Sequence, residues 1–312
     1  MRRVSDGGES SLEPRTSSLN IQSVKSVKSR FTARCRPSFF LILKYGESFQ
    51  RVNNEMNLRR ILTVATNVFW EVIRDRILYL IIIFALLMGA SVRLIPELAA
   101  TTEKKIILDV GLAAMSLLGL IATVFVATGL VNKEIEKRTV YLLVAKPISR
   151  AELIVGKHLG LSAVLAVLVA AMTVIYLAIL SLSRITFPLE SILIASLFIW
   201  FELCLMAGVG ILFGVFSSSL LATLLTFGVY LMGHSTRDLV ALGKLTKNPG
   251  IEQLMMGLYL VLPDLARFNL RNDAVYGQVP YLAGLITDAG YGLLYVVLLL
   301  SIAIAIFSRR EF

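Results

Sequence analysis

Long runs of apolar residues, separated by short charged segments, make up most of this chain from Ile77 onward. A run of about 18 or more apolar residues is long enough to cross the hydrocarbon core of a bilayer as a helix. The pattern therefore predicts an all-α polytopic membrane protein. The predicted crossings are about Ile77–Ile95, Ile106–Val131, Leu153–Leu182, two within Ile192–Gly233, and Ala289–Phe307.

The run Ile192–Gly233 is interrupted only by Glu202 and by the serine triplet Ser217–Ser219. As one helix it would be about 63 Å long, whereas the hydrocarbon core is only about 30 Å thick. Two crossings joined by a tight turn at the serines fit this length better. The chain is therefore expected to have six transmembrane helices, which places both of its ends on the same side of the membrane.

Composition agrees with a membrane protein. The chain is 56% hydrophobic and 17% charged, with a mean hydropathy of +0.77, whereas ordinary soluble domains carry about 25% charged residues. Cytoplasmic connections are enriched in Lys and Arg. The segments that carry this excess are the one before the first crossing, the one between the second and third crossings, and the C-terminal end: Arg59, Arg60, Arg74 and Arg76; Lys133, Lys137, Arg138, Lys146, Arg150 and Lys157; and Arg309 and Arg310.

This charge distribution predicts cytoplasmic N- and C-termini. Together with the basic N-terminal tail it accounts for most of the net charge of +10, so a nucleic-acid partner is not implied. Residues 1–55 are polar, basic and rich in serine, a composition that cannot form a core. They are expected to be either an over-extended gene start or a disordered cytoplasmic arm, ahead of a membrane domain at residues 56–312.

The segment Asn57–Arg76 has apolar residues at helical spacing and basic residues on its other face. A basic amphipathic helix beside a crossing is expected to lie in the membrane interface. The alternative is that it forms the polar end of the first crossing.

The charged link after the second crossing predicts two helices joined by a turn. Asn132 is expected to cap a short helix that begins at Lys133. Pro147 should end this helix near Lys146. Ser149–Glu152 has the S-x-x-E pattern of a capping box, which starts a helix that continues into the third crossing. Such a rigid, charged elbow is suited to docking on a soluble partner.

These residues carry a resemblance to a known family. The segments Glu134–Thr139, Lys146–Arg150 and Gly156-Lys157 resemble the region after the second span of ABC-2 type exporter permeases, in the branch associated with multi-copper enzyme maturation and gliding motility. Leu262–Phe268 and Phe307–Phe312 are similar to further parts of such permeases. The resemblance extends over residues 57–312.

The resemblance implies an ABC-2 exporter transmembrane domain with an N-terminal interfacial helix and a cytoplasmic coupling helix. It implies a separate cytoplasmic ABC ATPase that binds ATP and Mg, and a homodimer or a heterodimer with a second permease. It also implies a bacterial cytoplasmic membrane location. The residues expected to couple to the ATPase are Glu134, Glu136, Arg138, Lys146 and Arg150.

The chain is not expected to be an enzyme or to bind a cofactor itself. A phosphate-binding loop needs G-x-x-x-x-G-K-[ST], but Ala151 stands at its first glycine and His158 at its last position. The two histidines have no partners at metal-ligand spacing, and His158 is expected at the membrane boundary. Cys35 and Cys204 do not suggest a disulfide framework.

Three further features leave alternatives open. Glu202 is predicted near the middle of a crossing, where an acid either forms a structural hydrogen bond or belongs to a translocation or proton path. The spacings Gly156–Gly160 and Gly210–Gly214 permit close helix contact, either within the chain or between two chains. A short helix from Pro249 to about Leu262 is expected at the outer surface or as a re-entrant piece, either as a gate or as a cover.

A permease subunit of an ATP-driven exporter fits these patterns best. A stand-alone secondary transporter or channel is the main alternative, which predicts internal repeats and several charged or broken helices in the membrane. An integral membrane enzyme would need clustered His, Asp or Glu. The pattern of the crossings does not specify a substrate.

Overall fold

The computed structural model describes residues 57–75, 77–98, 103–136, 149–236, 238 and 249–309, and these are helical with short connections and without strands. Residues 1–55, which the sequence separates from the membrane domain, lie outside the described ranges. The helices are α2 (Leu58–Arg74), α3 (Tyr79–Leu98), α4 (Glu103–Glu136), α6 (Arg150–Leu182), α7 (Leu189–Phe216), α8 (Ser219–His234), α10 (Pro249–Val261), η1 (Leu265–Phe268), α11 (Arg271–Tyr276) and α12 (Leu282–Arg309).

Five of these helices, α3, α4, α6, α7 and α12, are long and apolar enough to cross a membrane. They coincide with five of the predicted crossings. The remaining predicted crossing contains α8, which has 16 residues. A helix of this length spans about 24 Å and falls short of the hydrocarbon core of about 30 Å. The count of six crossings therefore stays a prediction.

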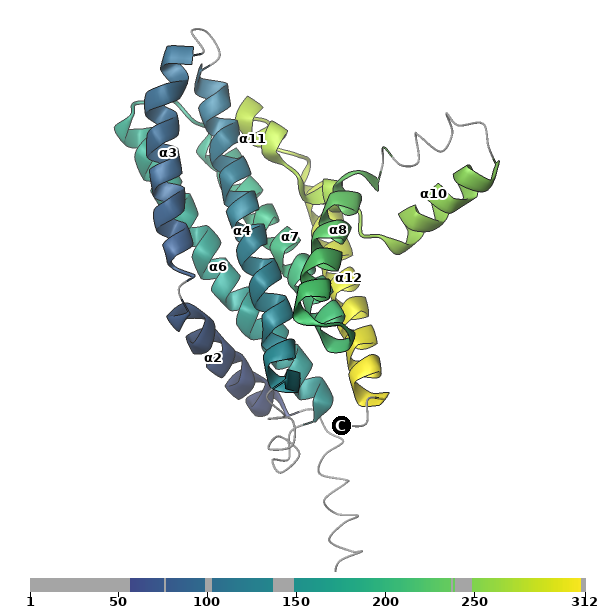
Figure 1. Cartoon of the computed structure of the whole chain (residues 1–312). Helices are drawn as coiled ribbons and strands as arrows, with labels where there is room; N and C mark the ends of the chain where they lie inside the picture. The colour runs from purple at the N-terminus through teal and green to yellow at the C-terminus, as the bar shows by residue number, and fades with distance from the viewer. Residues whose placement is uncertain are drawn as a thin grey trace, which may run out of the picture. The chain divides into compact units, whose positions relative to one another are not determined.

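The centre of the bundle is formed by α4 and α7, which are largely buried, whereas α3 and α12 are largely exposed. Figure 1 shows α7 running between α4, α6 and α12. Glycine permits the close approach of α4 and α7: a Cβ atom at Gly210 would lie 2.7 Å from the Cβ of Ala127. Gly210 thus serves packing within the chain.

The segment predicted as an amphipathic helix forms α2, which packs along the first turns of α6 (Figure 1). Its buried side chains are Ile61, Val68 and Val72. The spacing Gly156–Gly160 provides the surface for α2, since a Cβ at Gly160 would lie 2.6 Å from the carbonyl oxygen of Ala65. This glycine pair therefore also packs within the chain. The position of α2 in a membrane interface stays a prediction.

The structure corrects the expected start of the coupling helix. α4 continues without a break through Asn132 to Glu136, so the prediction that Asn132 caps a new helix at Lys133 is wrong. The reason is local: the buried Asn132 side chain donates a hydrogen bond to the Thr128 carbonyl, one turn earlier, at 3.0 Å. Its amide is satisfied inside α4 and does not need to end the helix. Residues 137–148, which include the predicted turn at Pro147, lie outside the described ranges.

The turn between α7 and α8 lies at Ser217 and Ser218, as predicted. α8 then ends beside the middle of α7, where His234 Nε2 lies 3.5 Å from Glu202 Oε1. Pro263 lies beside Gly233 at the end of α8, and Leu265 packs on the same glycine.

Residues 263–276 continue from there along α7. Phe268 is buried against Phe198 of α7, and the chain passes through η1 to α11, which lies toward the end where α7 begins (Figure 1). Much of this path is not α-helical. Irregular backbone at membrane depth is stable only when protein or water satisfies its polar groups. Residues 263–276 thus run along α7 as two short helical pieces, η1 and α11, joined by irregular backbone.

Candidate functional site

At one end of the bundle, α6 begins with the predicted capping box, which the structure confirms. The backbone N–H of Glu152 donates to the Ser149 hydroxyl at 3.1 Å. In return the Ser149 N–H donates to Glu152 Oε2 at 2.8 Å. These bonds satisfy backbone donors that the first turn of a helix leaves free.

The same carboxylate also holds the beginning of α2. The N–H of Asn57, the N-cap residue of α2, donates to Glu152 Oε1 at 2.8 Å. The Arg60 guanidinium lies 3.9 Å from Oε2. Glu152 is fully buried, so one negative charge sits at the N-termini of two helices, where the helix dipoles favour it. The sequence pattern predicts the bond within α6 but has no signal that pairs residue 57 with residue 152.

Arg150 joins the end of α12 to the same region. Its guanidinium donates to the carbonyls of Phe307 and Ser308 at 2.7 and 2.9 Å and lies over the Phe307 ring. The last carbonyls of a helix have no partner within the helix and favour a nearby cation. A residue predicted to couple to an ATPase thus also links α6 to α12.

Two further side chains on α6 are buried between helices. Lys157 donates from Nζ to the Leu130 carbonyl of α4 at 2.6 Å. His158 Nε2 lies 3.0 Å from the Cys204 carbonyl of α7. His158 is only 6% exposed, because α7 covers its imidazole, and its expected place at the membrane boundary stays a prediction. A helix wheel of α6 alone does not show that α7 covers this position.

The other predicted coupling residues are placed only in part. Glu134 and Glu136 belong to the last turn of α4, and the bond from Lys157 to Leu130 brings that end of α4 to the start of α6. The side chains of both residues, and Arg138 and Lys146 entirely, lie outside the described ranges. Their role in coupling stays a prediction.

Replacing Arg150 with glutamine is expected to loosen the end of α12. Losing charge-assisted bonds to two carbonyls should reduce local stability by about 1–2 kcal/mol, equivalent to roughly five- to thirtyfold faster opening. Hydrogen–deuterium exchange of peptides from the last turns of α12 measures this rate. Arg93→Gln on exposed α3 is the matched control, and equal exchange in both variants would show that Arg150 does not hold α12.

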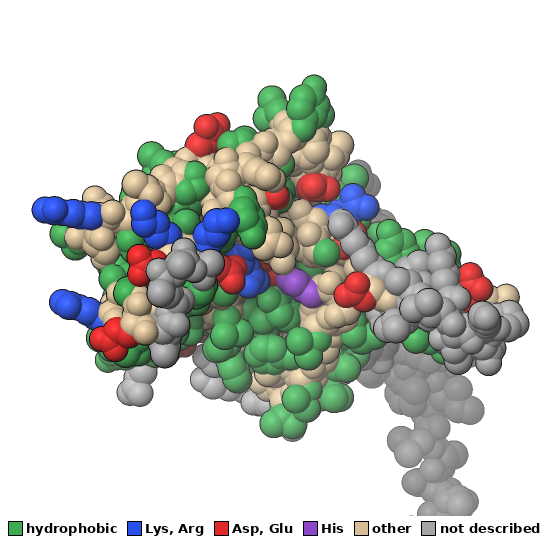
Figure 2. Space-filling view, turned by 90° about the horizontal axis from the view of Figure 1, so that it is seen from above, with side chains coloured by type: hydrophobic (Ala, Val, Ile, Leu, Met, Phe, Trp, Pro, Cys, Tyr) green, Lys and Arg blue, Asp and Glu red, His purple; other side chains and the backbone are tan. Residues whose placement is uncertain are grey.

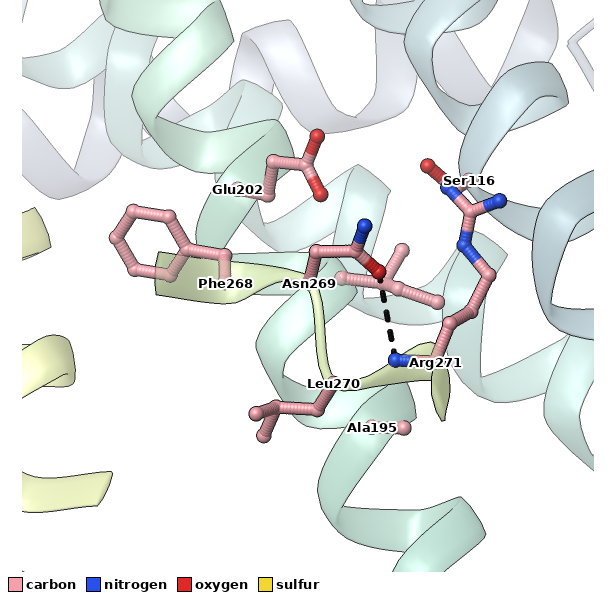
Figure 3. Close-up of a pocket in the computed structure, with 8 residues that line it drawn as sticks. Ser116, Ala195, Glu202, Phe268, Asn269, Leu270 and Arg271 are labelled. Atoms are coloured by element: carbon pink, nitrogen blue, oxygen red, sulfur yellow. Dashed lines mark hydrogen bonds between the residues drawn. The ribbon is translucent and has the colours of Figure 1, made fainter. Parts of the chain in front are cut away.

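Glu202 lies in the middle of α7 and is only 3% exposed. It borders a cavity of about 10 Å³, which has room for roughly one water molecule. Figure 3 shows the Glu202 carboxylate and the Arg271 guanidinium on either side of the Asn269 side chain. The cavity is lined by Ser116 of α4, Ala195, Ile199 and Glu202 of α7, and Phe268, Asn269, Leu270 and Arg271.

A second group of charged residues lies just after the end of α8. Thr236 donates to Asp264 at 3.3 Å, and Asp264 pairs with Arg267 at 3.2 Å. Arg267 also lies 3.4 Å from Asp288 of α12. Arg267 therefore lies between two carboxylates, which stabilise its positive charge. Sequence analysis identified Glu202 as a candidate site residue but did not identify the cluster of Thr236, Asp264, Arg267 and Asp288. These residues come from three separate segments.

No three potential metal ligands among His, Cys, Asp and Glu come together in the part of the chain that the structure describes. The structure thus has two candidate sites: the junction of α2, α6 and α12, and the charged cluster at the break between α8 and residues 263–276.

Comparison with known families found a match over nearly the whole chain. The model of the ABC-2 family transporter protein matches residues 17–312. A comparison with curated proteins found no match. The all-helical bundle with five long apolar helices agrees with the family match. The chain therefore belongs to the ABC-2 family of transporter proteins.

Proposed function

We propose that this chain is the membrane subunit of an ATP-driven exporter and that it transmits the conformational changes of a separate ATPase to the substrate path. The family match over residues 17–312 is the observation that carries this proposal. ABC-2 proteins are membrane subunits that associate with an ABC ATPase. The partner would bind ATP and Mg, while this chain would supply half of the path. Its resemblance to the copper-maturation and gliding-motility branch stays a prediction.

The junction of α2, α6 and α12 supports a coupling role for this end of the bundle. Glu152 binds the beginning of α2 to the beginning of α6, and Arg150 binds α6 to the end of α12. A force applied to the link between α4 and α6 would therefore move three helices together. In this proposal Glu134, Glu136, Arg138, Lys146 and Arg150 receive that force from the ATPase.

The orientation in the membrane, the number of crossings and the assembly are inferred from the charge pattern and from the family. The junction faces the cytoplasm of a bacterial cell, and both ends of the chain lie on that side. Six crossings are completed by α8 together with residues 263–276. Two such chains, or this chain and a second permease, form the transporter.

One observation favours the alternative of a stand-alone secondary transporter. Such proteins place broken helices and ionisable residues near the middle of the membrane, and Glu202 and His234 lie at a break of this kind. The two functions differ in whether an ATPase is part of the complex, which makes the partner the deciding measurement.

Purification of the protein from its native membranes in a mild detergent should bring down an ABC ATPase in stoichiometric amount. The double variant Glu134→Lys/Arg150→Glu is expected to lose this partner. Because Arg150 also binds α12, Glu134→Lys is tested alone as well, and Glu190→Lys at the first turn of α7 is the control that retains the partner. If no ATPase accompanies the wild-type chain under several mild conditions, the alternative of a secondary transporter gains support.

A further inference from the structure

Polar atoms at the break beside Glu202 lack the partners that buried groups normally have. Glu202 Oε1 and His234 Nε2 are buried without a hydrogen bond partner in the described part of the chain. Nevertheless, Oε1 and Nε2 are only 3.5 Å apart. Most buried polar side-chain atoms are hydrogen-bonded, because leaving one unpaired costs free energy. A small shift that brings a proton between these two atoms would satisfy both.

The acids outnumber the permanently charged bases by one at and around this pair. Three acids and two permanently charged bases belong to the two connected groups, namely Glu202, Asp264, Asp288, Arg267 and Arg271. With His234 neutral, this set carries one negative charge in excess. One added proton, shared by Glu202 and His234, makes the set electrically neutral. In a buried, weakly polarisable setting such compensation stabilises the protonated pair.

The pair can be reached from the end of the bundle opposite the α2–α6 junction. The His234 side chain is 22% exposed, whereas that of Glu202 is 4% exposed. Figure 2 views the molecule from the α11 end and shows Lys, Arg, Asp and Glu side chains exposed there. Arg267 and Asp288, at 37% and 26% exposure, extend the polar surface outward from Asp264. The imidazole is therefore the more exposed member of the pair.

We propose that Glu202 and His234 form a proton-binding site that opens toward the α11 end of the bundle. A proton from hydronium in the surrounding water is taken up between Oε1 and Nε2, and a water molecule is left behind. The proton ties the end of α8 to the middle of α7, and its loss releases that end. The other groups that face the pair are Ser116 of α4, Tyr230 of α8, Arg271 of α11, and Asp264. Asp264 in turn contacts Arg267, which pairs with Asp288, and the hydroxyl of Tyr291.

The full-length protein permits a direct test, because it contains only two histidines. With ¹³C-labelled histidine, the imidazole signals of His158 and His234 can be followed by NMR in detergent over about pH 4 to 9. The variant His158→Gln assigns them. The His234 signal is expected to titrate, and its midpoint in Glu202→Gln should shift by about one pH unit or more, since the two groups no longer share a proton.

Glu190→Gln, an exposed acid on the same helix, is the control and should leave the midpoint unchanged. An unchanged midpoint in folded Glu202→Gln, or a His234 signal that does not titrate, would overturn the proposal. If Glu202→Gln does not fold, the infrared band of the protonated carboxyl is followed in wild type and His234→Gln, whose midpoints must differ. Neither measurement needs an ATPase, so the result is independent of the proposed transport function.

Discussion

Replacing Gly160 with leucine is expected to separate α2 from α6 and to cost about 2–3 kcal/mol of stability. The added Cβ would lie 2.6 Å from the carbonyl oxygen and 3.1 Å from the Cα of Ala65. These are backbone atoms, so a change of side-chain rotamer cannot relieve the contact. The whole of α2 would have to move, and with it the buried side chains Ile61, Val68 and Val72.

The free energy of unfolding, measured for the purified chain in detergent, tests this expectation. Gly89→Leu is the matched control, because Gly89 lies on exposed α3 with no atom within 4 Å of an added Cβ. That substitution should change stability by no more than about 0.5 kcal/mol. If the two leucine variants are equally stable, α2 is not held closely against α6.

Replacing Glu152 with alanine is expected to have a similar effect for a different reason. The change removes the acceptor for the N–H groups of Asn57 and Ser149. Each of these partly buried hydrogen bonds to a carboxylate contributes about 1–2 kcal/mol. The stability of the chain should therefore fall by about 2–4 kcal/mol, which thermal unfolding in detergent can measure. Glu71→Ala, an exposed acid on α2, should leave it nearly unchanged.

Glu152→Ala also tests whether the α2–α6 junction carries coupling. If it does, ATPase that co-purifies with the chain should remain bound while transport per ATP falls, because α2 no longer moves with α6. Glu71→Ala should behave like wild type in both measurements. Normal stability and normal transport in Glu152→Ala would contradict the role given to the junction.

Local sequence patterns predicted the features that depend on neighbouring residues. Five long apolar runs became helices, the serines ended α7, and Ser149 and Glu152 formed a capping box. In each case the interacting residues lie within one or two helical turns, so their order along the chain is sufficient. The prediction at Asn132 failed because an asparagine can equally bond to the preceding turn of its own helix.

The sequence by itself thus determined an all-helical membrane protein with a charged, capped link between two of its crossings, because hydrophobicity and capping act over short distances. Only the tertiary structure decided that Glu152 also holds α2, that His158 is covered by α7, and that Glu202 meets His234 at a break. These contacts join residues far apart in sequence. They depend on how whole helices pack, which glycines such as Gly160 and Gly210 permit and which no local pattern records.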